Sequence, residues 1–257
     1  MTKKLLLIFL LLSSALPAQV VINQNFTPVA GDVWLTQKAD TTGVTEGDKG
    51  ENLYNFFDIK LIQKDSTKIN YVELNTTPVA DVFPTASVAS FVTLKNLNLY
   101  TYYKEEENTF YSLGTANYNL NYTFSVPLSK PKLIMKFPIK YGDDLENNYN
   151  FSISTRGSQV DYLGTYKLDC DGKGQIALPQ GTYDCIRIKT EDKYSDLAFG
   201  TNAHSLSIIT YSWYIKEFKF PVFQVKYTEQ NSGDRFTKLK EVIYTIINKN
   251  SPDKTHE

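Results

Sequence analysis

The densest group of residues that could do chemistry is the stretch KLDCDGKGQIALPQGTYDCIRIK, Lys167–Lys189, which contains both cysteines of the chain. Asp169 and Asp171 have a spacing found in calcium-binding loops, but such a loop needs further oxygen ligands and a bidentate glutamate at its end. The residues that follow, Lys173–Gln175, supply neither. Asp-Gly with a second glycine favours a tight turn between two strands. We therefore expect a turn here and no metal ion.

Zinc binding and acid–base catalysis have few candidate residues. A zinc site needs about four ligands, usually Cys or His, and the chain has two of each, with His256 in a charged C-terminal segment. His204 stands in a loop-like segment without a recognisable nucleophile motif. Asp143, Asp144 and Glu146 form the densest acidic cluster. Adjacent side chains of extended backbone point to opposite faces, so Asp143 and Asp144 would not cooperate as a catalytic pair. We predict a surface histidine, a solvated acidic loop, and no catalytic residue, metal or cofactor.

Aromatic side chains offer a different possibility, because exposed Tyr and Trp can form a binding platform for a glycan or a partner protein. The candidates are Tyr100, Tyr102, Trp213 and Tyr214, whose neighbours along the chain include further apolar residues. Burial between two sheets explains the same pattern, and strand alternation favours burial. A glycan or protein partner is therefore the weaker of two interpretations.

The first residues, MTKKLLLIFLLLSSALPAQ, have the pattern of a secretory signal peptide. Two lysines precede the apolar run Leu5–Leu12, and Ser13–Ala18 contains the small residues of a cleavage region. The apolar run is too short to cross a bilayer. We predict a signal peptide over residues 1–18 and a mature chain from Gln19, located in the periplasm or outside the cell without a transmembrane anchor.

The charge balance excludes one class of partner. The chain has 27 basic and 28 acidic residues, and removal of the two signal-peptide lysines leaves 25 against 28, a net charge of −3. A nucleic-acid-binding protein would show a basic footprint. We therefore expect no nucleic-acid partner.

Alternating apolar residues separated by turns indicate β-strands. NYNLNYTFS, residues 117–125, predicts one strand with one buried face. Leu97–Tyr103 and Thr109–Leu113 predict a hairpin, and a second hairpin is expected to turn at Asn231–Asp234. The last arm has helical spacing in places, but its β-branched run Val242–Ile247 favours a strand.

Two segments are predicted to lie outside the regular strands. Three prolines interrupt residues 127–138, and proline cannot donate to a strand ladder, so we expect an extended crossover there. The mature chain, 19–257, would then be one β-rich unit or two halves, 19–126 and 139–250. Residues 192–209 are the least regular part and predict a loop. Short strands with frequent turns predict an all-β fold, either an antiparallel sandwich or an open curved barrel.

The two cysteines allow opposing expectations. Export and an even cysteine count favour a disulfide between Cys170 and Cys185. If the segment folds as a three-stranded meander, the two cysteines lie about 10 Å apart, which is beyond the reach of a disulfide. Because the exported location weighs slightly more than this strand assignment, we predict a structural disulfide.

Seven phrases, in order over most of the mature chain, together resemble a family of uncharacterised exported proteins from bacteria that use the type IX secretion system. They are FTPVAGD, LYNFFD, FPTASVA, YSLG, KFPIKYGDD, DGKGQIALPQGTYDCIRIK and YSWYIKEFKFPVFQV. The resemblance implies an exported β-rich protein and carries no catalytic residues to transfer. The C-terminal NKNSPDKTHE differs from the glycine-rich, basic tail of many such proteins, which favours periplasmic residence.

These observations favour an exported β-protein that works as a binding or structural module. Two alternatives remain. One is a secreted hydrolase whose site is built from loops, and the other is a carrier that holds an apolar ligand in a barrel cavity.

Overall fold

A computed structural model describes residues 20–62, 66–119, 122–155, 158–197, 204–233 and 235–247. The predicted signal peptide and His256 lie outside these residues. The described residues form strands and three short 3₁₀ turns, η1 (Gln24–Phe26), η2 (Leu74–Thr76) and η3 (Ala80–Val82). The strands are β1 (Val33–Ala39), β2 (Gly50–Asn55), β3 (Thr67–Val72), β4 (Val88–Leu94), β5 (Leu97–Glu106), β6 (Thr109–Asn119), β7 (Tyr122–Lys136), β8 (Asp144–Thr155), β9 (Ser158–Leu178), β10 (Gly181–Asp196), β11 (His204–Ile215), β12 (Phe223–Ser232) and β13 (Arg235–Thr245).

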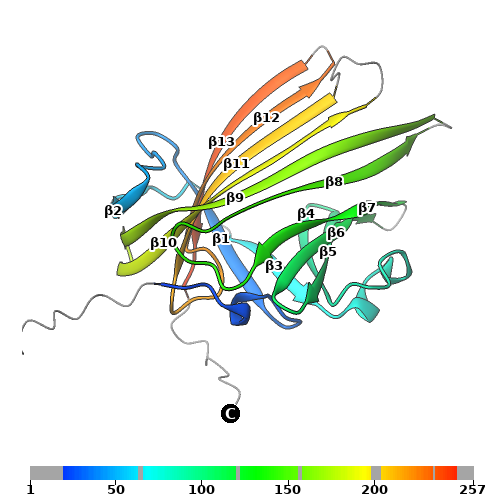
Figure 1. The fold of residues 1–257 in the computed structure, drawn as a ribbon. Coiled ribbons are helices and arrows are strands. Elements are labelled where there is room, and N and C mark those ends of the chain that lie inside the picture. The colour runs from blue at the N-terminus through cyan, green and yellow to red at the C-terminus, as the bar shows by residue number, and fades with distance from the viewer. Residues whose placement is uncertain are drawn as a thin grey trace, which may run out of the picture.

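Twelve of the described strands form a closed antiparallel barrel (Figure 1). Around the ring the order is β1-β3-β4-β5-β6-β7-β8-β9-β10-β11-β12-β13, and β13 pairs with β1 to close it. β2 stands outside the ring and runs parallel to β9, with Gly50–Asn55 against Gly172–Ala177. The prediction of an all-β fold is confirmed. Of the two predicted architectures the chain forms a barrel and not a sandwich, and the barrel is closed.

Pairing register decides which side chains face the barrel interior, because directly opposed residues of antiparallel strands point to the same side. Phe151 of β8 lies opposite Tyr162 of β9, and their rings stack with centroids 4.8 Å apart. The N-terminal segment covers the lower end of the barrel (Figure 1), where Ile22 exchanges two backbone hydrogen bonds with Ile139. Phe26 adds its ring to the same core cluster. The interior at this end is therefore an apolar core.

The connection from β1 through β2 packs on the outer wall of the barrel over β10–β13. Trp213 is fully buried there, with Phe56 and Tyr54 from the β2 region packed edge-on against its ring at 5.1 and 5.4 Å. Phe56 also stacks on Phe223 at 4.0 Å. Aromatic pairs of this kind contribute about 0.5–1.5 kcal/mol each beyond the area they bury. The outer wall thus carries a second apolar core.

A polar anchor fixes the same connection. Arg187 of β10 faces outward, and its Nε donates to Asp171 Oδ1 at 2.8 Å. Its Nη1 donates to the carbonyl oxygens of Glu46 and Gly47. Both charged side chains are almost fully buried, at 1% and 2% exposure. One buried arginine therefore ties the loop before β2 to the barrel wall.

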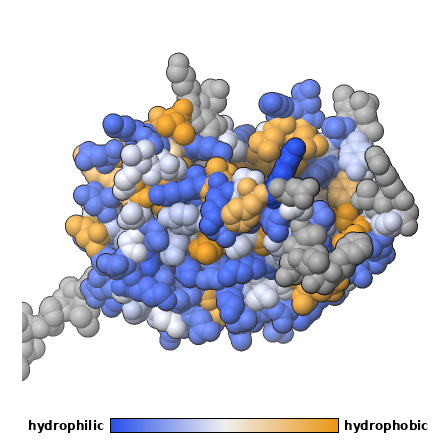
Figure 2. Space-filling model, turned by 90° about the horizontal axis from the view of Figure 1, so that it is seen from above, coloured by the Kyte–Doolittle hydropathy of each residue, from blue (hydrophilic) through white to orange (hydrophobic). Residues whose placement is uncertain are grey.

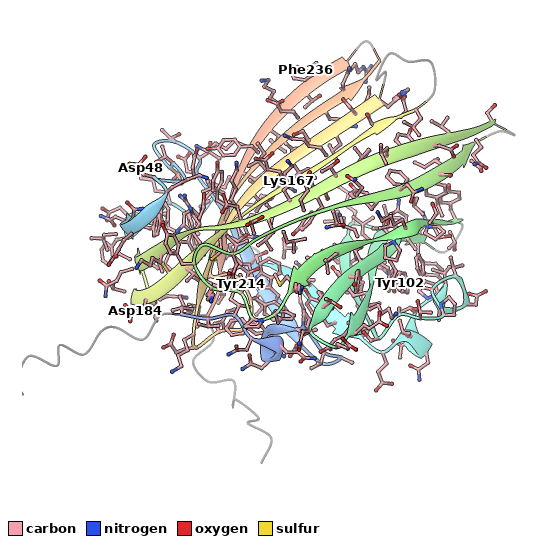
Figure 3. All side chains as sticks on the ribbon, viewed as in Figure 1. Asp48, Tyr102, Lys167, Asp184, Tyr214 and Phe236 are labelled. Atoms are coloured by element: carbon pink, nitrogen blue, oxygen red, sulfur yellow. The ribbon has the colours of Figure 1, made fainter. Side chains whose placement is uncertain are left out.

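A third apolar cluster lies on the outer wall over β4–β6. Phe83, from the connection between β3 and β4, stacks on Tyr102 of β5 with ring centroids 4.0 Å apart. Ala89, Tyr100, Leu113 and Ala116 complete this cluster. Figure 3 shows Tyr102 on this side of the molecule, away from the β2 region. Two long connections thus cover much of the barrel's outer wall, so that apolar residues occur on both faces of the strands.

The face of the molecule shown in Figure 2 is mainly polar, with apolar residues in small separate groups. Within the described residues, no helix has the length and apolar character needed to span a bilayer.

Both predicted hairpins are confirmed. β5 and β6 pair from Glu106 opposite Thr109, and β12 and β13 pair from Ser232 opposite Arg235. The last arm is a strand and not a helix.

Three local predictions are wrong. Residues 117–125 are not one strand, because β6 ends at Asn119 and β7 begins at Tyr122, with these two residues paired. Residues 127–138 are not a crossover, since most of them belong to β7, which pairs with β6 and β8 around several register shifts. The predicted loop 192–209 instead contains the end of β10 and the start of β11, and its residues 198–203 lie outside the described residues. The first and second halves of the chain therefore form one sheet.

Candidate ligand cavity in the barrel

A cavity of about 180 Å³ lies inside the lower end of the barrel. Residues of β1, β3, β5, β6, β7, β11 and β12 form its walls together with the segments around η1 and before β12, and the cavity is partly open to solvent. Its lining consists of Phe26, Thr27, Pro28, Trp34, Tyr71, Tyr103, Phe110, Ile134, Met135, Phe137, Tyr214, Lys219, Phe220, Pro221 and Gln224.

A continuous series of ring contacts, most of them stacked, forms one side of this cavity. Phe220 stacks between Trp34 at 5.6 Å and Tyr71 at 5.4 Å. Tyr71 lies 6.4 Å from Tyr103, which stacks on Phe110 at 5.0 Å. Such a wall presents flat apolar faces, which suit another ring or a flat apolar group.

Few polar groups enter the cavity, and most already have partners. Trp34 Nε1 donates to Thr245 Oγ1 at 2.9 Å, and Gln224 Nε2 donates to Ser212 Oγ at 2.8 Å. Thr27 is 4% exposed, and its hydroxyl oxygen has no hydrogen-bond partner among the described groups. A buried hydroxyl without a partner is uncommon in folded proteins and calls for an explanation.

An ion pair stands beside the cavity. Lys219, one of the lining residues, donates from Nζ to Asp32 Oδ2 at 2.6 Å. The same carboxylate oxygen accepts the Val29 backbone N–H at 2.8 Å. Because both charged side chains are about one-quarter exposed, this pair marks the side of the cavity nearest to solvent.

The cavity tyrosines are neutral phenols. Burial raises the pKa of Tyr214 above its ordinary value. Burial, followed by the neighbouring Tyr103 and Tyr214, raises the pKa of Tyr71 well above its ordinary value. These side chains are therefore suited to packing and hydrogen bonding, and not to acting as bases at neutral pH.

A charged cluster lies elsewhere on the inner wall. Lys132 Nζ donates to Asp192 Oδ2, and the Tyr149 hydroxyl donates to Asp192 Oδ1, both at 2.6 Å. Lys132 Nζ also lies 5.0 Å from the Tyr149 ring centroid and 5.7 Å from that of Tyr166. Burial, followed by the Asp192 charge, raises the pKa of Tyr149. Each charge is compensated, so we interpret this cluster as structural.

Of the four predicted aromatic site residues, only Tyr214 lines the cavity. Figure 3 shows it inside the barrel near the lower end. Trp213, the preceding residue, faces the outer wall and is fully buried there. Tyr100 and Tyr102 are buried under the connection before β4. None of the four forms an exposed platform.

The predicted disulfide is wrong, because Cys170 and Cys185 are both free and buried. Residues 158–178 form one continuous strand, so the expected meander does not occur. Cys185 pairs with Gly174 across the β9–β10 ladder, four residues from Cys170, a separation of about 13 Å along the strand. The side chains also face different cores, Cys170 the interior and Cys185 the outer wall. Both the distance and the facing forbid a bond.

The predicted turn at Asp171–Gly174 is wrong for the same reason, since these residues lie within β9. Asp169 pairs with Lys49 at 3.1 Å. No group of His, Cys, Asp and Glu side chains in the described part of the chain is placed to hold a metal ion.

The remaining candidates lie apart from the cavity. His204 is mainly exposed, in agreement with a surface position, and its Nδ1 lies 3.0 Å from Asp196 Oδ2. Asp144 and Glu146 belong to β8, so the predicted acidic loop is confined to Asp143, which accepts the Lys140 backbone N–H.

Sequence reasoning missed most of the cavity, including Thr27, Trp34 and Phe220. The available signal was the occurrence of the short segments Phe-Thr-Pro and Phe-Pro outside the predicted strands. Their apolar side chains were not assigned to the face of any strand.

The chain was also compared with known proteins, and neither a family model, nor a curated protein, nor a solved structure matched it.

Proposed function

We propose that this protein is a non-enzymatic binding protein that holds a small ring-containing ligand with one polar substituent inside its barrel. The observation that carries the proposal is the aromatic-lined cavity of about 180 Å³, and Thr27, one of its lining residues, has a buried hydroxyl without a partner. Among the roles considered from the sequence, the carrier with a barrel cavity is the one that these features support best.

The size of the cavity limits the ligand. A dry apolar cavity of about 150 Å³ accepts benzene, whereas sites for larger organic ligands span about 300–1,000 Å³. A single substituted ring therefore fits the space, and the aromatic wall from Trp34 to Phe110 favours a flat shape. A hydroxyl or amine on that ring would pair with Thr27 Oγ1.

The lining supports binding rather than catalysis. Its described titratable side chains are buried neutral tyrosines and Lys219, whose charge is paired with Asp32. Nucleophilic catalysis would require a nucleophile within hydrogen-bond reach of a base, and the described lining contains no such pair.

Isothermal titration calorimetry with p-cresol and with toluene tests this proposal. The two compounds have the same ring and differ in one hydroxyl. A neutral hydrogen bond contributes about 0.5–1.5 kcal/mol, so p-cresol should bind about two- to tenfold more tightly than toluene. In Thr27→Val, which removes the hydroxyl and keeps the shape, the two affinities should become equal.

A cavity-filling variant supplies the control. Ile134→Phe places a larger side chain in the cavity and should abolish binding of both compounds while the protein stays folded, as checked by its circular dichroism. Absence of binding to the unmodified protein would refute the proposal. So would binding that Ile134→Phe leaves unchanged, because the compounds would then occupy another site.

We also propose that the chain is exported, from its N-terminal pattern and its resemblance to exported proteins of bacteria with type IX secretion. The mature protein should begin at or near Gln19. N-terminal sequencing of protein from periplasmic and medium fractions measures this directly, and soluble cytoplasmic protein that retains Met1 would contradict it.

A further inference from the structure

A second and larger cavity lies outside the barrel, along β2. It is an open groove of about 530 Å³. One wall is the chain from Asp40 to Asp48, and the other is β2 with the residues that follow it to Lys60. Figure 1 shows β2 at the outer side of the molecule, and Figure 3 shows Asp48 on the loop beside it. This groove shares no lining residue with the barrel cavity.

The groove follows the free edge of β2. β2 pairs with β9 on one side, and no other described strand pairs with it. Five consecutive residues, Asn52–Phe56, line the groove. Because successive side chains of a strand point to opposite faces, a lining of consecutive residues means that the cavity approaches the strand from its edge.

Backbone hydrogen bonding shows which groups this edge presents. Phe56 N–H donates to Ala177 O of β9 at 2.8 Å. In a parallel pair, alternate residues direct both of their backbone groups to the same neighbour. Glu51, Leu53 and Asn55 therefore direct their N–H and C=O groups away from β9. Within the described residues these groups have no backbone partner. This row spans about 13 Å and is a template for another strand.

The opposite wall is already satisfied and held in place. Lys240 donates to the carbonyl oxygens of Thr41 and Val44, and Arg187 donates to those of Glu46 and Gly47. These long side chains reach the loop from the barrel wall. The groove therefore has one fixed wall with paired carbonyls and one wall with unpaired backbone groups.

The charge of the groove is negative. Asp40, Asp48 and Asp58 line it, against one cation, Lys60. None of the three carboxylates forms an ion pair within the described residues, although the charge of Lys60 acts on Asp40. A hydrogen bond from the Thr42 backbone N–H lowers the pKa of Asp40 and keeps it ionised. A cationic side chain in the groove would meet unpaired negative charge.

We propose that this groove binds an extended peptide segment with basic side chains at alternate positions, which adds to β2 as a further strand. Backbone hydrogen bonds to Glu51, Leu53 and Asn55 would supply affinity, as in other complexes formed by strand addition. The basic side chains would face the groove carboxylates. The opposite face of the peptide would lie beside Leu53, a residue that is 66% exposed.

Fluorescence anisotropy with a labelled peptide of alternating lysine and valine, Lys-Val-Lys-Val-Lys-Val-Lys with blocked ends, tests the proposal on the full protein. The matched probe replaces each lysine by glutamate. The lysine peptide should bind, and the glutamate peptide should bind at least tenfold more weakly. The double variant Asp48→Asn, Asp58→Asn should weaken binding of the lysine peptide by about two- to fivefold per charge removed. Asp81→Asn, at an exposed position on η3, should leave the affinity for the lysine peptide unchanged.

Leu53→Pro tests the strand-addition geometry. Its N–H points away from β9, so proline removes no bond of the barrel and is tolerated at an edge, but it blocks an incoming strand. Affinity should fall at least about tenfold, whereas Leu53→Thr should bind nearly as the unmodified protein does. If Leu53→Pro does not fold, a lysine peptide with N-methyl groups at alternate residues makes the same test on the unmodified protein. Equal binding of the lysine and glutamate peptides, or of the methylated and unmethylated ones, would overturn the proposal.

Discussion

The buried ion pair between Arg187 and Asp171 should be the most sensitive polar contact of the outer wall. Arg187→Met keeps the apolar stem and removes the guanidinium. Asp171 would then keep a carboxylate that is 2% exposed, with Oδ1 newly unpaired and Oδ2 already without a partner. Removing one partner of a buried ion pair costs about 3–5 kcal/mol. For a domain of this size that corresponds to a fall in Tm of about 6–20 °C.

Urea unfolding followed by circular dichroism measures this change from the midpoint and the slope. Arg187→Met with Asp171→Leu removes both charges and should recover at least about 2 kcal/mol relative to the single variant, because no uncompensated charge remains. Lys49→Met is the matched control: it breaks the exposed pair with Asp169 and should change stability by less than about 1 kcal/mol. The reasoning would be refuted if Arg187→Met and Lys49→Met were equally stable.

Three further predictions follow from single contacts. Burial raises the pKa values of Cys170 and Cys185 to about 12. At pH 8 the thiols of the folded protein should therefore react with iodoacetamide at least on the order of 100-fold more slowly than those of the unfolded protein. Mass spectrometry of the unfolded protein should show two alkylated thiols, and a single accessible or oxidised thiol would contradict this prediction. A hydrogen bond from Lys189 is the main cause that lowers the pKa of Glu191 to about 2 from 4.5. This contribution to stability is present above pH 4.5 and is lost as the pH falls toward 2, so Glu191→Gln should lessen the loss of stability between pH 5 and 2.5 in urea titrations, and an unchanged loss would argue against it. In Gly174→Ala the added Cβ would lie 2.0 Å from a backbone oxygen of β2, so the β2 amides should lose hydrogen-exchange protection, and unchanged protection would show that β2 can shift without cost.

Local signals in the sequence predicted the strands well where a turn and its two arms are adjacent. The β5–β6 hairpin and the β12–β13 hairpin follow from alternation and from polar turn residues, which act over a few positions. The β-branched run in β13 decided correctly between strand and helix. The all-β class follows from the sum of such local preferences.

The glycines at 172 and 174 show where local reasoning fails. Asp-Gly with a second glycine is the pattern of a turn, yet both residues lie in the middle of β9. A Cβ at Gly172 would stand 2.2 Å from the Tyr54 hydroxyl, and one at Gly174 would meet the Asn52 carbonyl. The glycines are needed because β2 docks there, more than 100 residues away in sequence. A tertiary contact of this kind leaves no local pattern.

The prolines of β7 failed as a signal for a related reason. Pro127 lies opposite Gly114, where a Cβ would stand 2.9 Å from the proline Cα. The ladder between β6 and β7 is irregular at this point, with a register shift between Ser112 and Gly114. Proline is excluded from regular central strands but is accommodated at such irregularities. Predicting β7 would have required knowing that a glycine on the neighbouring strand makes room for it.

The candidate cavity depends on ring closure, which no short pattern encodes. Trp34 and Phe220 stack because β1 pairs with β13, which brings together parts of the chain almost 190 residues apart. Alternation does predict that Trp213 and Tyr214 face opposite sides of their strand. It does not say which side is the interior, because the connections that cover the outer wall require apolar residues there too. Whether Tyr214 or Trp213 faces the cavity is therefore decided by the closed barrel together with the connections that cover its outer wall.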